Sequence, residues 1–463
     1  MGCTAPAYLQ RRAKTSPLWA LINEYFETVK RDWPERFEAE YGPWRPHWDR
    51  AIEGFLACGD LECGFARVRC SCGSESLLPF SCKRRKLCPS CDARRRVEWA
   101  DHLLEHVLPD LAYRHLVFTL PKVLRRIFMQ DRALLGELTR TAYEVTRAFL
   151  AAQFPAVEGG VPYFVSSVHT FGSVANLHPH AHALCSAGIM DREGVFHRLP
   201  EDFEWSPLAE LFRHAVLEML VKRARLREAT RTMLLKWRHS GFGADASTGT
   251  APGDREGLMR LACYLDKSPL SLSRMHYTPG ASQVVYHGKN PSAPGRGTVQ
   301  YDPVAFLALV LVHVPDRYEV RVRYYGAASS TIRRGGRNGR LRPSGVEDER
   351  GPDAPVEYEG AYVKARRRTW ARLLARVYGV DALKCRRCGR RMRIIAFITD
   401  PDVVEKILRH IGKWGEGRGR GPPEGSPGGA GATPSERRVI VDEYAQEFPP
   451  DDDAPVPEYD WGA

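Results

Sequence analysis

The stretch His178-Pro179-His180-Ala181-His182-Ala183-Leu184-Cys185 places three imidazoles at alternate positions in an apolar setting. Alternate side chains of a β-strand lie on one face, so His180 and His182 are expected to point the same way at a separation fixed by the backbone. Imidazole binds divalent transition metals and also accompanies magnesium or manganese where a phosphate is polarised. The stretch therefore predicts half of a metal site on a strand over about 178–187.

The residues alone leave other interpretations of this stretch open. One is a histidine-rich strand without a metal. Another is a zinc hydrolase, which needs a further carboxylate or histidine close by, as in His-Glu-x-x-His, and no such motif occurs. The third metal ligand is either His178, which shares the face of His180 and His182 on a regular strand, or His169. Pro179 disturbs regular strand pairing, which weakens the case for His178.

Composition limits the class of protein. The chain has 463 residues, more than a single core usually holds, and two or three domains are expected. Lys and Arg number 68 against 56 Asp and Glu, and the net charge of +12 indicates a polyanionic partner. No run of about 18 apolar residues and no signal-peptide pattern occurs, so we expect a cytoplasmic protein with no membrane partner.

Seven of the twelve cysteines fall between residues 58 and 91. In a basic chain without a secretion signal, such a cluster is typical of zinc ligands rather than disulfides. A Cys-x-x-Cys turn supplies two zinc ligands, so Cys88 and Cys91 are the firmest pair. Cys70 and Cys72 are their expected partners.

The remaining cysteines leave alternatives. The spacing of Cys70 and Cys72 is tighter than usual, so Cys82 can replace one of them. Cys58 and Cys63 either complete a second site or stay outside. Cys385 and Cys388 form a second Cys-x-x-Cys pair, and a further zinc site there needs distant partners.

Basic residues suggest where a nucleic acid binds. One set flanks the cysteines and suits phosphate contacts: Lys83, Arg84, Arg85, Lys86, Arg94 and Arg95. A second set combines guanidinium groups with an aromatic ring, which suits single-stranded DNA: Arg323, Tyr324, Arg333 and Arg334. For any one charged residue a solvated surface position is the competing interpretation, and Tyr324 also fits a half-buried strand residue.

Apolar periodicity and turn residues divide the chain into segments. These are an N-terminal helical segment (1–57), the zinc-binding module with the helix after it (58–108), a core (109–345), a basic region with Cys-x-x-Cys (346–412) and a tail expected to be disordered (413–463). In the core, strands are expected over 115–120, 163–170 and 178–187, and helices over 123–153, 208–237 and 256–266. A Gly/Ser/Ala loop is expected after residue 243, and the fold class is α+β.

The motifs together resemble the rolling-circle transposases of the insertion-sequence 91 class and their common-region relatives. The resemblance rests on His115 to Lys122, His169 to His182, Trp237 to Phe242, and Tyr264 with Ser268 to Leu272. Phe80 to Cys91 resembles the zinc-binding domain of that family, and Arg323 to Gly326 and Cys385 to Ile398 resemble its C-terminal segments. The likeness covers about residues 50 to 412, in the order of the family.

The resemblance implies an HUH-endonuclease core, in which an antiparallel sheet is flanked by helices, with a small N-terminal zinc-binding module. It implies a metal-dependent tyrosine DNA endonuclease and strand transferase. Tyr264 is the implied nucleophile, which forms a 5′-phosphotyrosine link and releases a 3′-hydroxyl, with Mg²⁺ or Mn²⁺ at His180 and His182 and Zn²⁺ at the cysteines. The implied partner is DNA, especially single-stranded element ends and target, in the nucleoid of a bacterial-type cell.

The chain departs from the two-tyrosine members of the family. One helical turn before Tyr264 the residue is Arg260, so the chain resembles the single-tyrosine variety. A second cleavage then needs another molecule, reuse of Tyr264 or a 3′-hydroxyl.

Two other functions fit the same residues. A rolling-circle replication initiator shares the cleavage chemistry and differs in the DNA that surrounds its gene. A non-catalytic, zinc-dependent DNA-binding protein predicts DNA binding that survives replacement of His180 and no cleavage with any metal.

Overall fold

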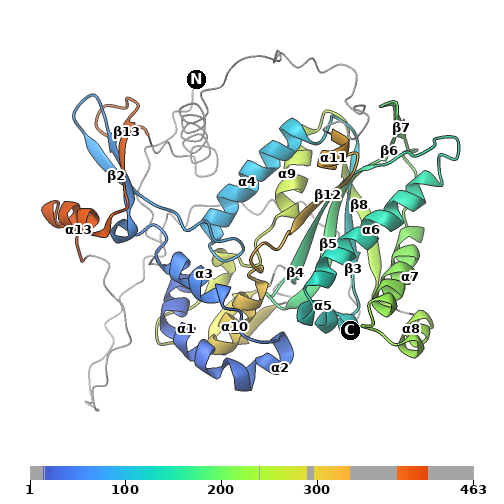
Figure 1. Cartoon of the computed structure of the whole chain (residues 1–463), viewed down its shortest axis with the longest axis horizontal. Coiled ribbons are helices and arrows are strands. Elements are labelled where there is room, and N and C mark those ends of the chain that lie inside the picture. The colour runs from blue at the N-terminus through green and yellow to red at the C-terminus, as the bar shows by residue number, and fades with distance from the viewer. Residues whose placement is uncertain (1–13, 15, 239, 289–296, 334–382, 416–463) are drawn as a thin grey trace.

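The computed structural model describes residues 14, 16–238, 240–288, 297–333 and 383–415 (Figure 1). The tail expected over 413–463 lies outside the described residues from residue 416 onward. The helices are α1 (Pro17–Arg36), α2 (Glu38–Tyr41), α3 (His47–Leu56), α4 (Pro89–His106), α5 (Lys122–Gln130), α6 (Ala133–Ala151), α7 (Pro207–Lys222), α8 (Glu228–Leu235), α9 (Arg255–Leu265), α10 (Pro303–His313), α11 (Ser330–Arg333) and α13 (Pro401–His410). No helix among these residues is long and apolar enough to cross a bilayer.

The strands form separate antiparallel sheets. The strands are β1 (Phe65–Arg69), β2 (Glu75–Pro79), β3 (Tyr113–Thr119), β4 (Tyr163–Phe171), β5 (Leu177–Ser186), β6 (Gly188–Met190), β7 (Phe196–Arg198), β8 (Gly243–Thr250), β9 (Met275–His276), β10 (Val284–His287), β11 (Thr298–Tyr301), β12 (Val322–Gly326) and β13 (Arg393–Ile398). Antiparallel sheets flanked by helices confirm the predicted α+β class.

The largest sheet has the order β12-β4-β5-β3-β8, and all its pairs are antiparallel. The histidine strand β5 lies at its centre, between β4 and β3. Residues that face each other in an antiparallel pair point to the same side of the sheet, and His169 faces His180. His182 faces Val117 on β3, two residues from His115. The register therefore gathers histidines from three neighbouring strands on one face.

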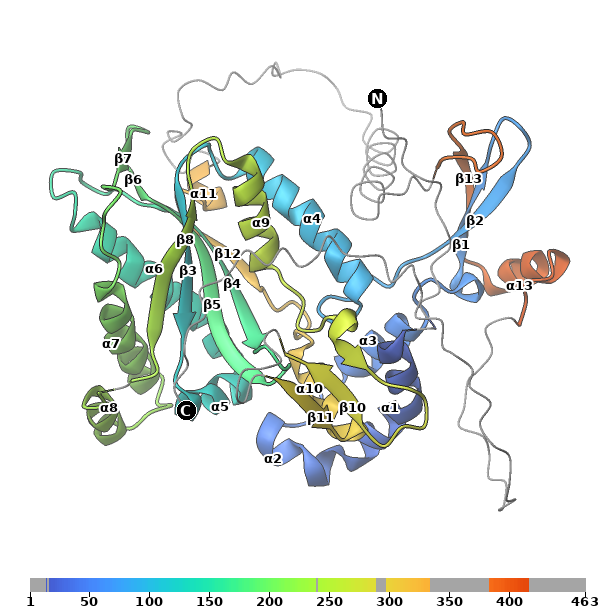
Figure 2. The ribbon, with the colours of Figure 1, turned by 180° about the vertical axis from the view of Figure 1, so that it is seen from behind.

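Different helices cover the two faces of this sheet (Figures 1 and 2). Helices α5, α6 and α7 pack on the face opposite the histidines, against Phe118, Phe164 and Ala181. Helices α4 and α9 cover the histidine face through Leu103, Ala262 and other apolar residues. Because α9 lies on that face, the C-terminal end of the helix comes close to the imidazoles.

The N-terminal helices do not form a core of their own. Helices α1 to α3 bury their apolar residues against α10 and the small sheet β11-β10-β9. Residues that precede and follow most of the five-stranded sheet in the sequence therefore share one core. Trp33 and Trp48 are fully buried there, with ring centroids 4.8 Å apart. Cys58, Cys88 and Cys91 border the same core.

A third sheet joins two segments that lie far apart in the sequence. Strand β13 pairs with β1 of the β1–β2 hairpin, in the order β13-β1-β2, and α13 packs on Leu61 and Phe65 through Val404 and Leu408. This sheet and α13 lie at one end of the molecule, away from the five-stranded sheet (Figures 1 and 2).

Three expected elements were wrong. The helix expected over 123–153 is two helices, since α5 ends at Gln130 and α6 starts at Ala133. The helix expected over 208–237 is interrupted: α7 ends at Lys222, Ala224 has a positive φ of 53°, and α8 starts at Glu228. The expected Gly/Ser/Ala loop is the edge strand β8, which pairs with β3. A Cβ at Gly249 would lie 2.7 Å from the carbonyl oxygen of Tyr113, so close backbone approach explains this glycine within a strand.

Candidate active site and metal centres

Three histidines converge on one face of the central sheet. His169 of β4 and His180 and His182 of β5 each have a ring nitrogen within 4.8 Å of the others. His169 and His182 are buried, and His180 is half-buried. Three imidazoles at this separation form a ligand set for a single divalent cation.

Hydrogen bonds orient each of the three rings. His169 Nε2 donates to the carbonyl oxygen of Leu265 at 2.9 Å, and His180 Nδ1 donates to the carbonyl oxygen of His178 at 2.6 Å. His182 Nδ1 lies 2.9 Å from Nε2 of His115 and shares one proton with it. A histidine ligand typically uses one ring nitrogen in this way and turns the other to the metal.

The remaining nitrogens fit a cation. His182 Nε2 is buried and has no hydrogen-bond partner among the described residues. Burial lowers the pKa of His180 to about 4 and holds the pKa values of His169 and His182 well below their ordinary value. The rings are therefore neutral at pH 7, the form that coordinates a metal.

Tyr264 projects from the last turn of α9 onto this histidine group. Its half-buried ring meets the ring of His182 edge to face, with centroids 5.2 Å apart, and the ring of His115 at 5.5 Å. Lys267 places its ammonium group 5.2 Å from the centroid of the same ring. A phenol, a cationic side chain and a set of metal ligands thus share one site.

His169 and His178, the two candidates for the third ligand, take different places. The pairing of β4 with β5 shifts register between His169 and Phe171, beside Pro179, so the alternation that would bring His178 onto the ligand face is broken. The carbonyl oxygen of His178 instead accepts from His180. The structure groups His169, not His178, with His180 and His182.

Lys86 connects the cysteine-rich segment to α9. Its ammonium donates to the carbonyl oxygens of Asp266 at 2.5 Å and Lys267 at 2.9 Å, and it forms ion pairs with Asp266 and with Asp92 of α4. Only 3% of Lys86 is exposed. The sequence assigned Lys86 to DNA, and the structure corrects this, because a buried, fully engaged ammonium cannot reach a phosphate.

Eight of the cysteines in the described part of the chain form two groups of four. One consists of Cys58, Cys82, Cys88 and Cys91, with three Sγ–Sγ distances of 3.7 Å. Sulfurs at the corners of a zinc tetrahedron with bonds of about 2.3 Å lie about 3.8 Å apart. The first group therefore fits Zn²⁺.

The second group consists of Cys70, Cys72, Cys385 and Cys388. The sequence expected Cys70 and Cys72 beside Cys88 and Cys91, and the structure does not group them so. Cys58 and Cys82, which were alternatives, complete the first group instead. Cys63 is exposed and belongs to neither group.

The other predicted DNA contacts differ in exposure. Lys83 and Arg95 are exposed, whereas Arg84, Arg85 and Arg94 are partly buried. Arg85 donates to the carbonyl oxygen of Glu319, and Arg94 to the hydroxyl of Ser81.

The second predicted set is partly engaged within the protein. Arg323 donates to the carbonyl oxygen of Val320, and Tyr324 accepts from the indole of Trp99 at 2.8 Å, so Tyr324 is a half-buried strand residue. Arg333 ends α11, and Arg334 lies outside the described residues.

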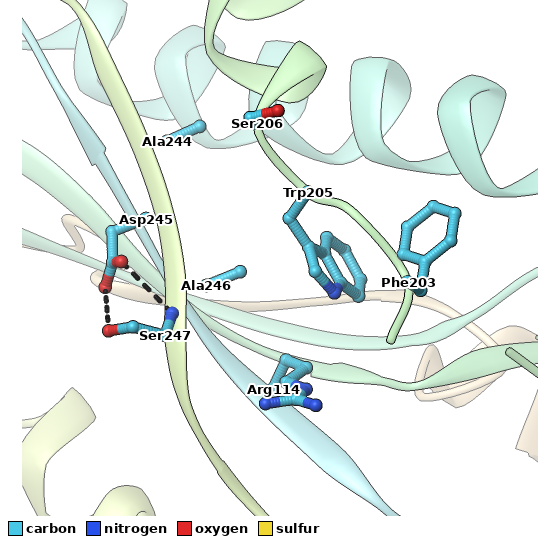
Figure 3. Close-up of a pocket in the computed structure, with 8 residues that line it drawn as sticks. All are labelled: Arg114, Phe203, Trp205, Ser206, Ala244, Asp245, Ala246 and Ser247. Carbon is cyan, nitrogen blue, oxygen red and sulfur yellow. Dashed lines mark hydrogen bonds between the residues drawn. The ribbon is translucent and has the colours of Figure 1, made fainter. Parts of the chain in front are cut away.

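A pocket of about 350 Å³ opens elsewhere on the central sheet (Figure 3). It is lined by Arg114, Phe203, Trp205, Ser206, Ala244, Asp245, Ala246 and Ser247. Arg114 precedes His115 on β3 and so points to the opposite face. The pocket is therefore separate from the histidine group.

The sequence of this chain is similar to those of known transposases. A family model described as a transposase zinc-binding domain of the IS91 class matches residues 28–120, and one described as a putative transposase matches residues 164–335. The transposase for insertion sequence element IS801 of Pseudomonas savastanoi pv. phaseolicola is 28% identical over 372 residues, which cover 75% of this chain and 83% of that protein. The chain belongs to the IS91 family of transposases.

A second relative aligns with a shorter part of this IS91-family transposase. The putative transposase y4qJ of Sinorhizobium fredii is 28% identical over 199 residues, 42% of this chain and 49% of that protein. No solved structure matches. The zinc-binding match includes all of the first cysteine group, but Cys385 and Cys388 lie beyond both matched ranges.

Sequence reasoning missed the residues that support the site. The local pattern marks His115 only as the start of a strand, and it does not distinguish Asp266 or Lys267. The alternation of side chains along β3 could have identified His115. Once β3 is paired with β5, this alternation puts His115 on the same face of the sheet as His182. Nothing in the sequence links Lys86 to Asp266.

Proposed function

We propose that this IS91-family transposase cleaves and rejoins single-stranded DNA in rolling-circle transposition, with Tyr264 as the nucleophile. The observation that carries the proposal is the contact of the Tyr264 ring with His182, a member of the three-histidine group. A nucleophile beside metal ligands is the arrangement that metal-assisted phosphoryl transfer needs.

His169, His180 and His182 hold the cation in this proposal. The donor set and the unpartnered Nε2 of His182 support it. Magnesium or manganese, when bound, supplies positive charge that polarises the scissile phosphate.

Tyr264 performs the covalent step. Its phenol oxygen loses a proton and forms a bond to phosphorus, while the bond from phosphorus to the 3′-oxygen of the preceding nucleotide breaks. The 3′-oxygen takes up a proton, and the 5′-phosphate stays on the tyrosine. Because a phosphodiester is exchanged for another, attack by a 3′-hydroxyl reverses the step and joins strands.

Nearby charged side chains of the chain assist this step. The ammonium of Lys267 lies 5.2 Å from the centroid of the Tyr264 ring and places positive charge beside the proposed nucleophile. The exposed Lys83 and Arg95 supply contacts to the phosphates of the bound strand.

The polarity of the covalent product tests the function. The purified protein is incubated with Mn²⁺ and a single-stranded oligonucleotide from an element end, labelled at its 5′ or its 3′ terminus. We expect the 3′-terminal label to become linked to the protein and the 5′-terminal label to be released on a fragment with a free 3′-hydroxyl. Chelation of the metal should abolish both products.

The His182→Ala variant provides the matched arm. We expect it to form no adduct while still binding the oligonucleotide, since the basic residues are unchanged. Binding by wild type without any cleavage in Mg²⁺ or Mn²⁺ would instead support a non-catalytic DNA-binding protein.

A further inference from the structure

The second cysteine group joins two segments that are far apart in the sequence. Cys70 and Cys72 lie in the turn of the β1–β2 hairpin, and Cys385 and Cys388 precede β13. The Sγ atoms of Cys70 and Cys388 are 3.4 Å apart, and those of Cys72 and Cys385 are 3.6 Å apart, across separations of 318 and 313 residues. A disulfide would bring two sulfurs to about 2 Å, so the four thiols form a cluster rather than two bridges.

A glycine with a positive φ ends the turn that contains each pair. Gly73 follows Cys72 with a φ of +86°, and Gly389 follows Cys388 with a φ of +70°. Nothing lies within 4 Å of a Cβ built at either glycine, so the positive φ rather than crowding accounts for them. The backbone N–H of Gly73 donates to the carbonyl oxygen of Cys70, and that of Gly389 donates to the carbonyl oxygen of Cys385. Each turn directs two sulfurs to a common point.

The apolar core around these sulfurs is small. The small core that includes Cys70 and Cys385 contains few buried apolar side chains besides them, among them Val68, Leu78 and Met392. A module with so small a core usually depends on a metal or disulfides to fold. Four cysteines without a histidine or carboxylate form a soft tetrahedral set, which selects zinc or iron.

We propose that a second zinc ion, bound by Cys70, Cys72, Cys385 and Cys388, fastens residues 383–415 to the β1–β2 hairpin. The pairing of β13 with β1, from Phe65 opposite Ile398 to Arg69 opposite Arg393, continues from the metal site. The C-terminal Cys-x-x-Cys segment is then part of the N-terminal zinc module and not a separate region. This inference does not depend on the chemistry of Tyr264.

Metal stoichiometry in matched variants tests the proposal. Zinc and iron per chain are measured by plasma mass spectrometry on the full-length protein after exhaustive dialysis. We expect Cys70→Ser and Cys388→Ser each to lose one zinc relative to wild type. The double variant Cys70→Ser/Cys388→Ser should also lose one, because both residues bind the same ion.

Two further variants serve as controls for the number of ions lost. Cys82→Ser/Cys388→Ser should lose two ions, since these residues belong to different groups, and Cys63→Ser should lose none. The proposal is overturned if Cys388→Ser keeps all its zinc, if Cys70→Ser/Cys388→Ser loses two ions, or if the ion lost is iron.

A measurement on the wild-type protein covers the case in which variants do not fold. Replacement of zinc by cadmium-113 gives a nuclear magnetic resonance signal whose shift reports the number of sulfur ligands. We expect two resolved signals from all-sulfur sites, and a single such signal would contradict the proposal.

Discussion

His115 lies outside the three-histidine group but contacts one of its members, His182. Its Nε2 shares a proton with Nδ1 of His182, and burial together with the nearby His180 lowers its pKa to about 4. A neutral His115 ring can accept from Nδ1–H of His182, and that tautomer of His182 leaves its Nε2 available to a metal ion.

His115→Ala should weaken metal binding. Loss of such a supporting hydrogen bond typically costs 10- to 100-fold in metal affinity, so we expect the Kd for Mn²⁺, measured by electron paramagnetic resonance, to rise by about that factor. Replacement of the exposed His106 by Ala serves as the control. An unchanged Kd in His115→Ala would exclude a supporting role for this ring.

Glu319 stabilises the fold by a different kind of contact. Burial opposes its ionisation, but Arg132, whose guanidinium donates to both carboxylate oxygens at 2.8 and 3.0 Å, outweighs burial together with Arg321. The pKa of Glu319 is lowered from 4.5 to about 2. A carboxyl with a lowered pKa adds stability that is complete above its ordinary pKa and is lost as the pH falls toward the lowered value.

Glu319→Gln should therefore show a pH-dependent loss of stability. We expect the free energy of unfolding at pH 7, from urea titration, to fall by about 3 kcal/mol, the value of a shift of this size. The difference from wild type should shrink between pH 4.5 and pH 2. A difference that stays constant over this range would mean that the charge of Glu319 does not stabilise the fold, and the exposed Glu228→Gln is the control.

Helix α9 is positioned both by the five-stranded sheet and by the cysteine-rich segment. The C-terminal end of this helix meets two fixed groups: the imidazole of His169, which donates to the carbonyl oxygen of Leu265, and the ammonium of Lys86. Lys86 lies two residues before Cys88, a member of the first cysteine group. The position of this group therefore determines where Lys86 meets the end of the helix that carries Tyr264. The cysteine-rich segment thus helps to hold the end of α9 that carries Tyr264.

Lys86→Met tests this coupling. The change leaves the buried Asp92 without its cation, and breaking a buried pair in this way typically costs about 3–5 kcal/mol of unfolding free energy. We also expect the yield of the DNA adduct to fall in protein that remains folded by circular dichroism. Lys222→Met, at an exposed position on α7 and so on the face of the sheet opposite the histidines, should change neither value, and equal adduct yields in the two variants would contradict the coupling.

The elements differ in how far the sequence reveals them. The histidine strand could be predicted, because the alternation of His180 and His182 is a local pattern. Strand β8 could not, since its small residues lack apolar alternation and its pairing with β3 is a tertiary contact. The third ligand required the register between β4 and β5.

The cysteine groups show the same limit over a longer distance. Spacing identifies the turns that supply pairs of ligands, but it does not tell which two pairs share an ion. That choice depends on the path of the chain between Cys72 and Cys385, over 313 residues. The sequence accordingly named all eight of these cysteines as candidate ligands but placed Cys70 and Cys72 beside Cys88 and Cys91 instead of beside Cys385 and Cys388.

The whole molecule joins the five-stranded sheet, an N-terminal helical core and a cysteine module, and its net charge is +12. Lys83 and Arg95, both exposed, flank the first cysteine group, whose segment contacts α9 through Lys86. A strand bound at Tyr264 can therefore meet positive charge from the cysteine module.

Salt dependence measures this contribution. Each phosphate neutralised on a single strand changes the slope of log affinity against log salt by about 0.7, so Lys83→Ala/Arg95→Ala should flatten the slope by about 1.4 if both contact phosphates. Fluorescence anisotropy with a single-stranded oligonucleotide gives the slope. An unaltered slope would place the DNA path elsewhere on the protein.

The identity of the covalently modified residue is the most direct test of the central claim. Wild type, Tyr264→Phe and Tyr277→Phe are incubated with Mn²⁺ and an element-end single strand, and the adduct is digested and located by mass spectrometry. We predict that wild type and Tyr277→Phe carry the nucleotide on the peptide that contains Tyr264, and that Tyr264→Phe forms no adduct. An adduct of normal yield in Tyr264→Phe, or one located on another tyrosine, would contradict the account.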